Sequence, residues 1–141
     1  MAHYVVNVKD VEPAPVEVKD GWNQMDIRLV VEESRSGSKE VCFWRTVFRP
    51  DARHYKHRHT RSDEVIYVIR GRGASGAEDR EVEVKAAGDV HFISKNTVHW
   101  MRNLDPKEEL EVCGCYTNTG TLEGSGYVFE SEVTNADMTI R

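Results

Sequence analysis

The sequence has no long apolar stretch and few cysteines. Its clearest apolar run, residues 65–69, is five residues long, whereas a membrane-spanning helix needs about 20. The opening Met-Ala-His-Tyr lacks the basic start and apolar stretch of a secretory signal. The three cysteines, Cys42, Cys113 and Cys115, are an odd set that makes no even disulfide framework. We therefore expect no membrane partner and a reducing, cytoplasmic location.

Positive charge is also in short supply. The chain has 19 Lys and Arg against 24 Asp and Glu, which leaves a net charge of −5. An acidic chain does not attract phosphate backbones in general. Residues 49–61 are rich in arginine, lysine and histidine, but the histidines there follow a metal-ligand pattern. No nucleic-acid partner is expected.

Helical periodicity, internal repeats, low-complexity tracts and linkers are absent as well. The 141 residues amount to one domain with a core of its own. Short β-rich runs, separated by turn residues, predict an all-β sandwich or barrel. We expect strands at residues 25–31, 41–48, 64–69, 81–84, 88–93, 98–104 and 110–116.

The expected barrel spans residues 25–118. Residues 1–24 are expected to form an N-terminal arm with short edge strands at 4–8 and 16–18, because Pro13 and Pro15 prevent central pairing. Residues 119–141 are expected to form a glycine-bearing loop and one more strand near 127–129.

Four side chains carry the chemical signal. His57 and His59 are two apart in an extended segment, so they face the same way with Cα atoms about 6.5 Å apart. Glu64 opens the next strand, and His99 lies on a later one. Three imidazoles and a carboxylate can surround a divalent ion and leave one or two coordination positions open, which separates a reactive site from a structural one.

The pattern around these residues resembles a known family. His57-x-His59-x4-Glu64-x6-Gly71 is similar to the first motif of the cupin superfamily, and Gly88-x5-Ser94-x-Asn96-x2-His99-x3-Asn103 resembles the second. The chain departs from the usual motifs at three turn positions: Asp51 and Asn96 stand where glycine is usual, and Ser94 stands where proline is usual. The resemblance implies a jelly-roll β-barrel, often dimeric, with the metal inside the barrel mouth.

The strand that follows the histidine pair predicts a partner surface. If Glu64 points into the barrel, then Ile66 and Val68 do too, which leaves the apolar Val65, Tyr67 and Ile69 outside. A strand that is apolar on both faces is covered on both sides. The cover is the N-terminal arm, a second subunit or an arm swapped from one, and we expect a homodimer.

Other side chains are weaker candidates for the site. His91 is either a proton shuttle or a structural histidine. Tyr55 lies two residues before His57 and is therefore expected to face the cavity, whereas His54 is expected to be exposed in the basic turn. Candidate substrate contacts are Arg45, Phe92, Met101, Asn103 and Tyr127.

These observations predict a metal-dependent enzyme acting on a small oxygen-bearing, aromatic or enolisable substrate. The nitrogen-rich ligand set favours one divalent transition metal per chain, which is iron, zinc, nickel, cobalt, copper or manganese, over calcium or magnesium. Oxygenase-like chemistry is the first expectation. A polyketide cyclase or isomerase that uses a Lewis-acid metal, and a non-catalytic module that binds a small ligand, remain as alternatives.

Overall fold

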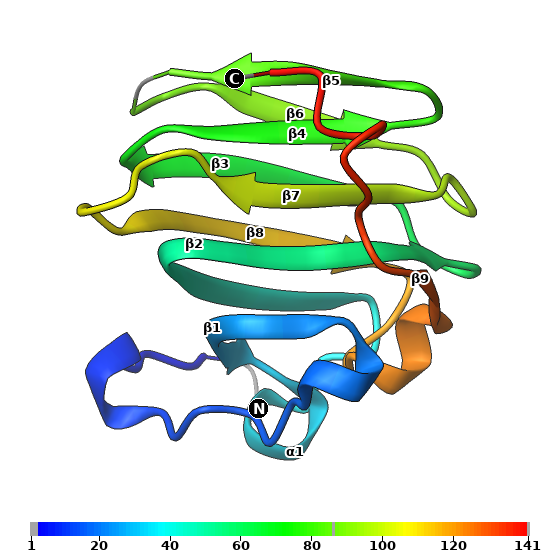
Figure 1. Ribbon diagram of the computed structural model, residues 1–141. Helices are drawn as coiled ribbons and strands as arrows, with labels where there is room; N and C mark the ends of the chain where they lie inside the picture. The colour runs from blue at the N-terminus through cyan, green and yellow to red at the C-terminus, as the bar shows by residue number, and fades with distance from the viewer. Residues whose placement is uncertain (1–2, 86, 141) are drawn as a thin grey trace.

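The computed structural model describes residues 3–85 and 87–140 and consists mainly of β-strands (Figure 1). The strands are β1 (Trp22–Val31), β2 (Val41–His59), β3 (Glu64–Arg70), β4 (Gly73–Ala77), β5 (Arg80–Val84), β6 (Val90–Ile93), β7 (His99–Asn103), β8 (Leu110–Thr117) and β9 (Tyr127–Ser131). A one-turn helix α1 (Glu33–Ser36) and the 3-10 turns η1 (Val8–Asp10), η2 (Val18–Asp20) and η3 (Glu123–Ser125) complete the elements. Within the described ranges, no helix has the length and apolar character needed to span a membrane.

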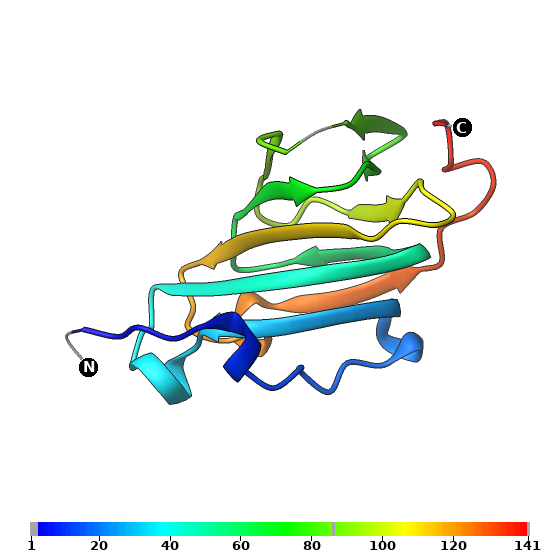
Figure 2. The ribbon, with the colours of Figure 1, turned by 90° about the vertical axis from the view of Figure 1, so that its left-hand side faces the viewer.

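All strand pairs are antiparallel and form one curled sheet (Figure 2). The path of paired strands runs β5-β4-β7-β2-β8-β3-β6, and β1 and β9 also pair with β2. The expected all-β jelly-roll architecture is confirmed. Because the path ends at β5 and β6, these two strands are the ends of the curled sheet.

The 19-residue strand β2 connects the layers of the barrel. In its first half, Trp44 lies opposite Leu29 of β1 and Gly114 of β8. In its second half, His57 lies opposite His99 of β7 and Phe129 of β9. Between the halves, the residue at position 51 has a left-handed φ of 63°, which accounts for the usual glycine at this turn.

Strict alternation puts apolar side chains inside the barrel. Along β3, Ile66 and Val68 are buried, whereas Tyr67 and Ile69 are 47% and 37% exposed. The predicted facing of this strand is therefore confirmed. Along β8, every second residue is buried in the same way, so these strands deliver alternate side chains to one interior.

The N-terminal arm differs from the prediction. Residues 4–8 and 16–18 form no strands, and the arm is extended chain with the turns η1 and η2. It still lies along β1: the Tyr4 hydroxyl donates to the Val30 carbonyl at 3.2 Å, and the Ala14 amide donates to the Ile27 carbonyl at 2.8 Å. The flanking Pro13 and Pro15 have no N–H with which to continue a ladder.

The C-terminal segment contains the expected strand, β9, followed by a tail that rises past β7 and β4 towards β5 (red in Figure 1). Val133 and Met138 of this tail pack on Trp100 of β7. The buried Glu81 carboxylate of β5 accepts hydrogen bonds from the Trp100 indole, the Arg102 guanidinium and the Ile140 amide. The tail is therefore held by both apolar and ionic contacts.

Candidate metal centre

The curled sheet brings together four side chains that are far apart in the sequence. His57 and His59 come from β2, Glu64 from β3 and His99 from β7, and all four are buried. One ligand atom from each lies within 4.8 Å of those of the others. The grouping expected from the motif spacing is therefore present in the folded chain.

Glu64 lies between two of the imidazoles. Its Oε1 is 3.0 Å from His99 Nε2 and 3.8 Å from His59 Nε2. Burial raises the pKa of this carboxyl, but the charge of His59 and the hydrogen bond with His99 outweigh it and leave the pKa lowered. Glu64 is therefore an anion that can offer an oxygen to a metal. A metal bound there would displace the proton that Glu64 shares with His99.

Backbone carbonyls orient two of the histidines. His57 Nδ1 lies 2.6 Å from the Tyr55 carbonyl, and His99 Nδ1 lies 2.9 Å from the Thr97 carbonyl. A carbonyl only accepts, so each Nδ1 carries the proton. This leaves the Nε2 atoms to face the centre, as the outer-shell bonds of metal-ligating histidines usually do.

His59 is oriented by a residue that sequence reasoning missed. Its Nδ1 lies 2.8 Å from Ser125 Oγ, and that hydroxyl donates to the Leu122 carbonyl at 2.6 Å. The hydroxyl proton is thus committed, so Ser125 accepts from His59 Nδ1–H. Ser125 is fully buried in η3. The only signal for it was its place between Gly124 and Gly126, which marked a turn but not a contact with β2.

The centre fits a divalent transition metal. His59 Nε2 is buried and has no hydrogen-bond partner among the described residues, an arrangement that a bound cation would satisfy. Burial lowers the pKa of His59 to about 4, and burial together with the neighbouring histidines lowers that of His57 well below its usual range. The neutral imidazoles of His57 and His59, the imidazole of His99 once the proton shared with Glu64 is displaced, and one carboxylate are the donors such metals prefer.

Two neighbouring predictions on β2 are reversed. His54, expected to be exposed, is buried, stacks on His57 at a centroid distance of 3.7 Å and faces the interior. Tyr55, expected in the cavity, packs instead with the tail cluster around Trp100. The cause is an irregularity in the β2–β7 ladder between His54 and His57, because one extra residue there inverts the alternation.

Two of the expected substrate contacts lie beside the four grouped side chains. Met101 is buried and lines the interior cavity. The Tyr127 ring lies 5.2 Å from that of His57, and its hydroxyl donates to the Asp20 carbonyl at 2.5 Å. Tyr127 therefore connects the centre to the end of the N-terminal arm.

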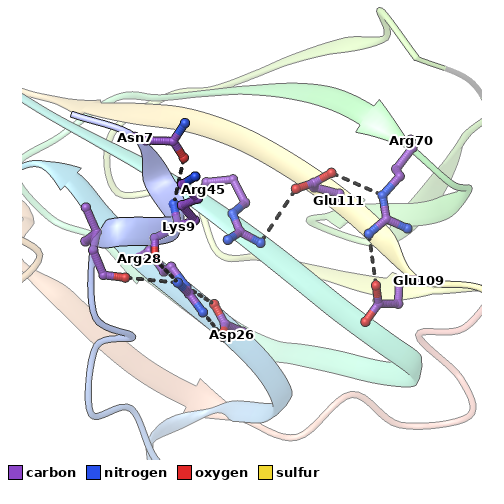
Figure 3. Close-up of polar contacts among 9 residues, drawn as sticks. Asn7, Lys9, Asp26, Arg28, Arg45, Arg70, Glu109 and Glu111 are labelled. Carbon is purple, nitrogen blue, oxygen red and sulfur yellow. Dashed lines mark hydrogen bonds and ion pairs between the residues drawn. The ribbon is translucent and has the colours of Figure 1, made fainter. Parts of the chain in front are cut away.

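The other expected contacts lie elsewhere. Arg45 is on the outer face of β2, 3.6 Å from Glu111 (Figure 3). Phe92 is 67% exposed. Asn103 is buried, but its amide donates to the carbonyls of Phe48, Arg49 and Glu108, so its role is structural. The sequence does not reveal which face of its strand each of these three side chains occupies, and the prediction that they line the pocket is wrong for that reason.

The interior cavity beside the four ligands is small, about 20 Å³, or room for roughly one water molecule. Its walls include residues His54, His57, Glu64, His99, Trp22, Trp44, Phe48, Tyr116, Ile66, Ile93 and Met101. Trp100 also borders it, but the Trp100 ring packs with the C-terminal tail. No lysine or arginine is among the described residues that line it. Ser75 of β4 lies on its wall, and Ser75 Oγ is 2.8 Å from Nδ1 of His91.

Comparison with solved structures finds the same architecture in several proteins. A cupin-like protein from Thermotoga maritima aligns with a TM-score of 0.73 and 24% identity over 93% of this chain and 98% of that one. A predicted oxalate decarboxylase from the same organism aligns at 0.71 and 22% identity, over 82% and 99%. The polyketide cyclase RemF from Streptomyces resistomycificus aligns at 0.71 and 19% identity, over 82% and 79%. At these identities the likeness establishes the fold.

Sequence comparison points the same way. No curated protein sequence matches the chain significantly, but the family model described as "Cupin domain" matches residues 44–113. This match includes most of β2, strands β3 to β7, the start of β8 and all four grouped side chains. With the structural likenesses, it shows that the chain belongs to the cupin superfamily.

Proposed function

We propose that the protein is a metal-dependent enzyme that acts on a small oxygen-bearing organic substrate, with oxygenase-like chemistry at His57, His59, Glu64 and His99. The observation that carries this proposal is the convergence of four buried donor atoms within 4.8 Å of one another. The Nδ1 atom of each imidazole is already engaged away from the centre. Hydrogen bonds of this kind at the second ring nitrogen are typical of histidines that bind a metal.

Each part of the site has a distinct task. A bound transition metal supplies Lewis acidity and, when redox-active, electrons for dioxygen. Glu64 supplies the negative charge that balances the cation, and Ser125 fixes the ring of His59. Met101 and the aromatic walls leave room for about one water molecule in the cavity, and exclusion of further water strengthens electrostatic interactions inside it.

The cavity favours small substrates. About 20 Å³ is far below the roughly 300–1,000 Å³ of ordinary ligand pockets, so a larger molecule requires the walls to move. A Lewis-acid cyclase or isomerase is the second candidate, and the likeness to a polyketide cyclase favours it. A polycyclic substrate, however, would have to displace several buried aromatic rings, and we therefore rank oxygenase-like chemistry first.

Elemental analysis of the purified protein tests the metal site. We expect one transition metal per chain, lost in His59→Ala and retained in the control His3→Ala, with the β-rich circular dichroism kept in both. Iron together with dioxygen uptake in the presence of diketones or catechols supports the oxygenase; zinc or nickel without uptake supports the second candidate. One metal per chain in His59→Ala would contradict the ligand assignment, and saturable ligand binding without turnover would indicate a binding module.

We further propose that the chain forms a homodimer through the outer face of β3 and β8. Tyr67 and Ile69 expose apolar surface there. A row of alternating charge, Arg45–Glu111–Arg70–Glu109, borders this face (Figure 3). A twofold axis can set such a row against itself with opposite charges facing. Light scattering should give twice the chain mass, reduced in Tyr67→Ser; a concentration-independent monomer would contradict the proposal.

A reducing, cytoplasmic location is also proposed. Cys42 is buried, Cys113 and Cys115 are half-buried, and none of the three forms a disulfide. Alkylation of denatured protein taken directly from cells should modify all three thiols. Fewer modified thiols would indicate oxidation during the life of the protein and argue for another compartment.

A further inference from the structure

The two ends of the curled sheet face each other across a surface groove. Strands β5 and β6 end the path of paired strands, and a groove of about 520 Å³ lies between them, lined on one side by β4 and β5 and on the other by β6. Val82, Val90 and Phe92 expose apolar surface along it, at 56%, 60% and 67%. The barrel is thus open on this side.

This groove and the interior cavity share part of their walls. Ser75 of β4 and Ile93 of β6 line both. Since Ser75 has one of the smallest side chains available, little material separates the groove from the cavity at this point. The cavity in turn contains the side chains of His57, Glu64 and His99.

Among the described residues, one side-chain hydrogen bond joins β4 to β6 across the floor of the groove. Ser75 Oγ on β4 lies 2.8 Å from His91 Nδ1 on β6, so it joins strands that do not pair with each other in the sheet. His91 Nε2 is buried and has no hydrogen-bond partner among the described residues. The imidazole is therefore held on one side only and can turn away when the bond opens.

A second groove of about 500 Å³ is the competing route. It lies between the N-terminal arm and the turn η3, and the residue it shares with the cavity is Trp22. The Trp22 ring is stacked on His54 at a centroid distance of 3.9 Å. Opening this route would separate two buried rings, whereas opening the other breaks one hydrogen bond.

The charges along the first groove disfavour anions. Three carboxylates, from Glu78, Glu83 and Asp89, and one guanidinium, from Arg80, line it. Arg72 and Lys85 each lie 4.0 Å from Glu83 and offset part of its charge. Beyond the floor, the cavity holds the carboxylate of Glu64 and no described lysine or arginine. An anion entering this way would lose its water without gaining a cationic partner from the chain.

We infer that the β5–β6 groove is the entrance to the metal cavity and that the Ser75–His91 hydrogen bond is its gate, which passes small uncharged molecules in preference to anions. The inference rests on the proposed function, because a small substrate must reach the four ligands. It assigns His91 a positioning role on the access path rather than a place among the ligands.

Tryptophan fluorescence of the metal-free protein provides the test. The rings of Trp22 and Trp44 belong to the core around the cavity, whereas the Trp100 ring packs with the C-terminal tail. The Trp100 signal is common to all variants, so a difference between variants in quenching by acrylamide, an uncharged molecule, reports entry to the cavity. Ser75→Ala removes the bond and should raise the quenching constant about twofold to tenfold, because the net stabilisation by one hydrogen bond changes an equilibrium constant by about that factor. The control Ser38→Ala, which loses a serine hydrogen bond outside the cavity, should leave it unchanged.

A second variant makes the gate assignment specific. His91→Leu removes the same bond from the other strand, so it should raise quenching equally, and the double variant should add nothing further. This variant carries the test alone if Ser75→Ala does not fold. Iodide should remain a poor quencher of all variants.

Three results would contradict parts of this inference. An unchanged acrylamide constant in folded Ser75→Ala and His91→Leu would overturn the gate. A rise in Leu122→Ala, on the competing groove, with no rise in Ser75→Ala would assign entry to the arm side. Iodide quenching as strong as that by acrylamide would overturn the charge selectivity. Because the test uses metal-free protein and measures no turnover, its outcome does not depend on whether the proposed metal site and activity are correct.

Discussion

Ser125 is the residue whose role in the site is most open to direct measurement. Its hydroxyl accepts from His59 Nδ1 and donates to the Leu122 carbonyl. We predict that Ser125→Ala weakens metal binding about 10- to 100-fold, the usual effect of removing an outer-shell partner. Competition with a chelator of known affinity measures this change.

The control for this prediction is Ser38→Ala, because Ser38 bonds the Val41 carbonyl and touches none of the ligands. Metal affinity in this variant should equal that of the parent protein. If Ser125→Ala loses about 1 kcal/mol of unfolding free energy but keeps its metal affinity, the hydrogen bond supports the fold alone.

The contrast between Ser125 and the four ligands shows what a sequence reveals about single residues. The grouping of the four proposed ligands was predictable, because motif spacing and strand parity place His57, His59 and Glu64 on one face. Ser125 lies 66 residues from His59, and no local pattern encodes a contact at that separation. It depends on how η3 docks beside β2, which is a property of packing.

At the scale of elements, strand β2 marks the limit of the alternation rule. The strand at residues 41–48 and the extended segment that carries His57 follow from the sequence pattern. The expected break at Pro50-Asp51 is wrong, because β2 runs without interruption from Val41 to His59. The irregularity between His54 and His57 does not follow from the pattern, because an extra residue in one strand changes pairing without changing composition. The alternation of inward and outward side chains is inverted across this irregularity, so His54 faces the interior and Tyr55 packs with the tail cluster.

The C-terminal tail is the element most dependent on one side chain. Glu81 accepts from the Trp100 indole at 2.9 Å, from two nitrogens of Arg102 at 2.8 Å each, and from the Ile140 amide at 3.1 Å. Arg102 in turn donates to the Ile140 carbonyl. Breaking a buried ion pair from one side costs about 3–5 kcal/mol.

We therefore predict that Glu81→Gln lowers the unfolding free energy by about 3 kcal/mol and speeds proteolysis within residues 132–140. Burial raises the pKa of Glu81, but its hydrogen bonds from Arg102 and Trp100 outweigh this and lower it overall. The stability from a carboxyl with a lowered folded pKa is present above its unfolded pKa and is lost as pH falls through the folded one. The difference in unfolding free energy between Glu81→Gln and the parent protein should therefore shrink as the pH falls through the lowered pKa of Glu81.

Glu83→Gln is the matched control for the tail. Glu83 lies on the same strand but is partly exposed, with Arg72 and Lys85 each 4.0 Å away, and such pairs contribute about 0–1 kcal/mol. Denaturation by urea measures both variants. Equal losses in the two would show that the anchor depends on β5 as a whole and not on the buried carboxylate.

At the scale of the whole molecule, the buried histidines set the response of the metal-free protein to acid. Burial lowers the pKa of His54 and His57 well below the usual range, and that of His59 to about 4. In the unfolded chain these groups titrate near 6.5. Between about pH 6.5 and 4, the unfolded state therefore binds protons that the folded state does not.

Stability must consequently fall as pH decreases through this window, by up to about 1.4 kcal/mol per pH unit for each such histidine. His54 stacks between Trp22 and His57. Replacing it removes one of the histidines that bind a proton only in the unfolded state, so the change in slope measures its contribution. His54→Phe keeps an aromatic ring in the stack, and we predict that it reduces the slope of unfolding free energy between pH 6 and 5 by about 1.4 kcal/mol per unit. Urea denaturation at several pH values, with chelator present, measures the slope.

Met101→Leu serves as the comparison, because it alters the same cavity wall without removing a group that binds a proton. Its slope should match the parent, whatever its effect on stability at pH 7. If His54→Phe also keeps the parent slope, then His54 binds the same number of protons in the folded and unfolded states. The interior would then admit a charged imidazole, and the water exclusion on which the proposed chemistry depends would be absent around the metal ligands.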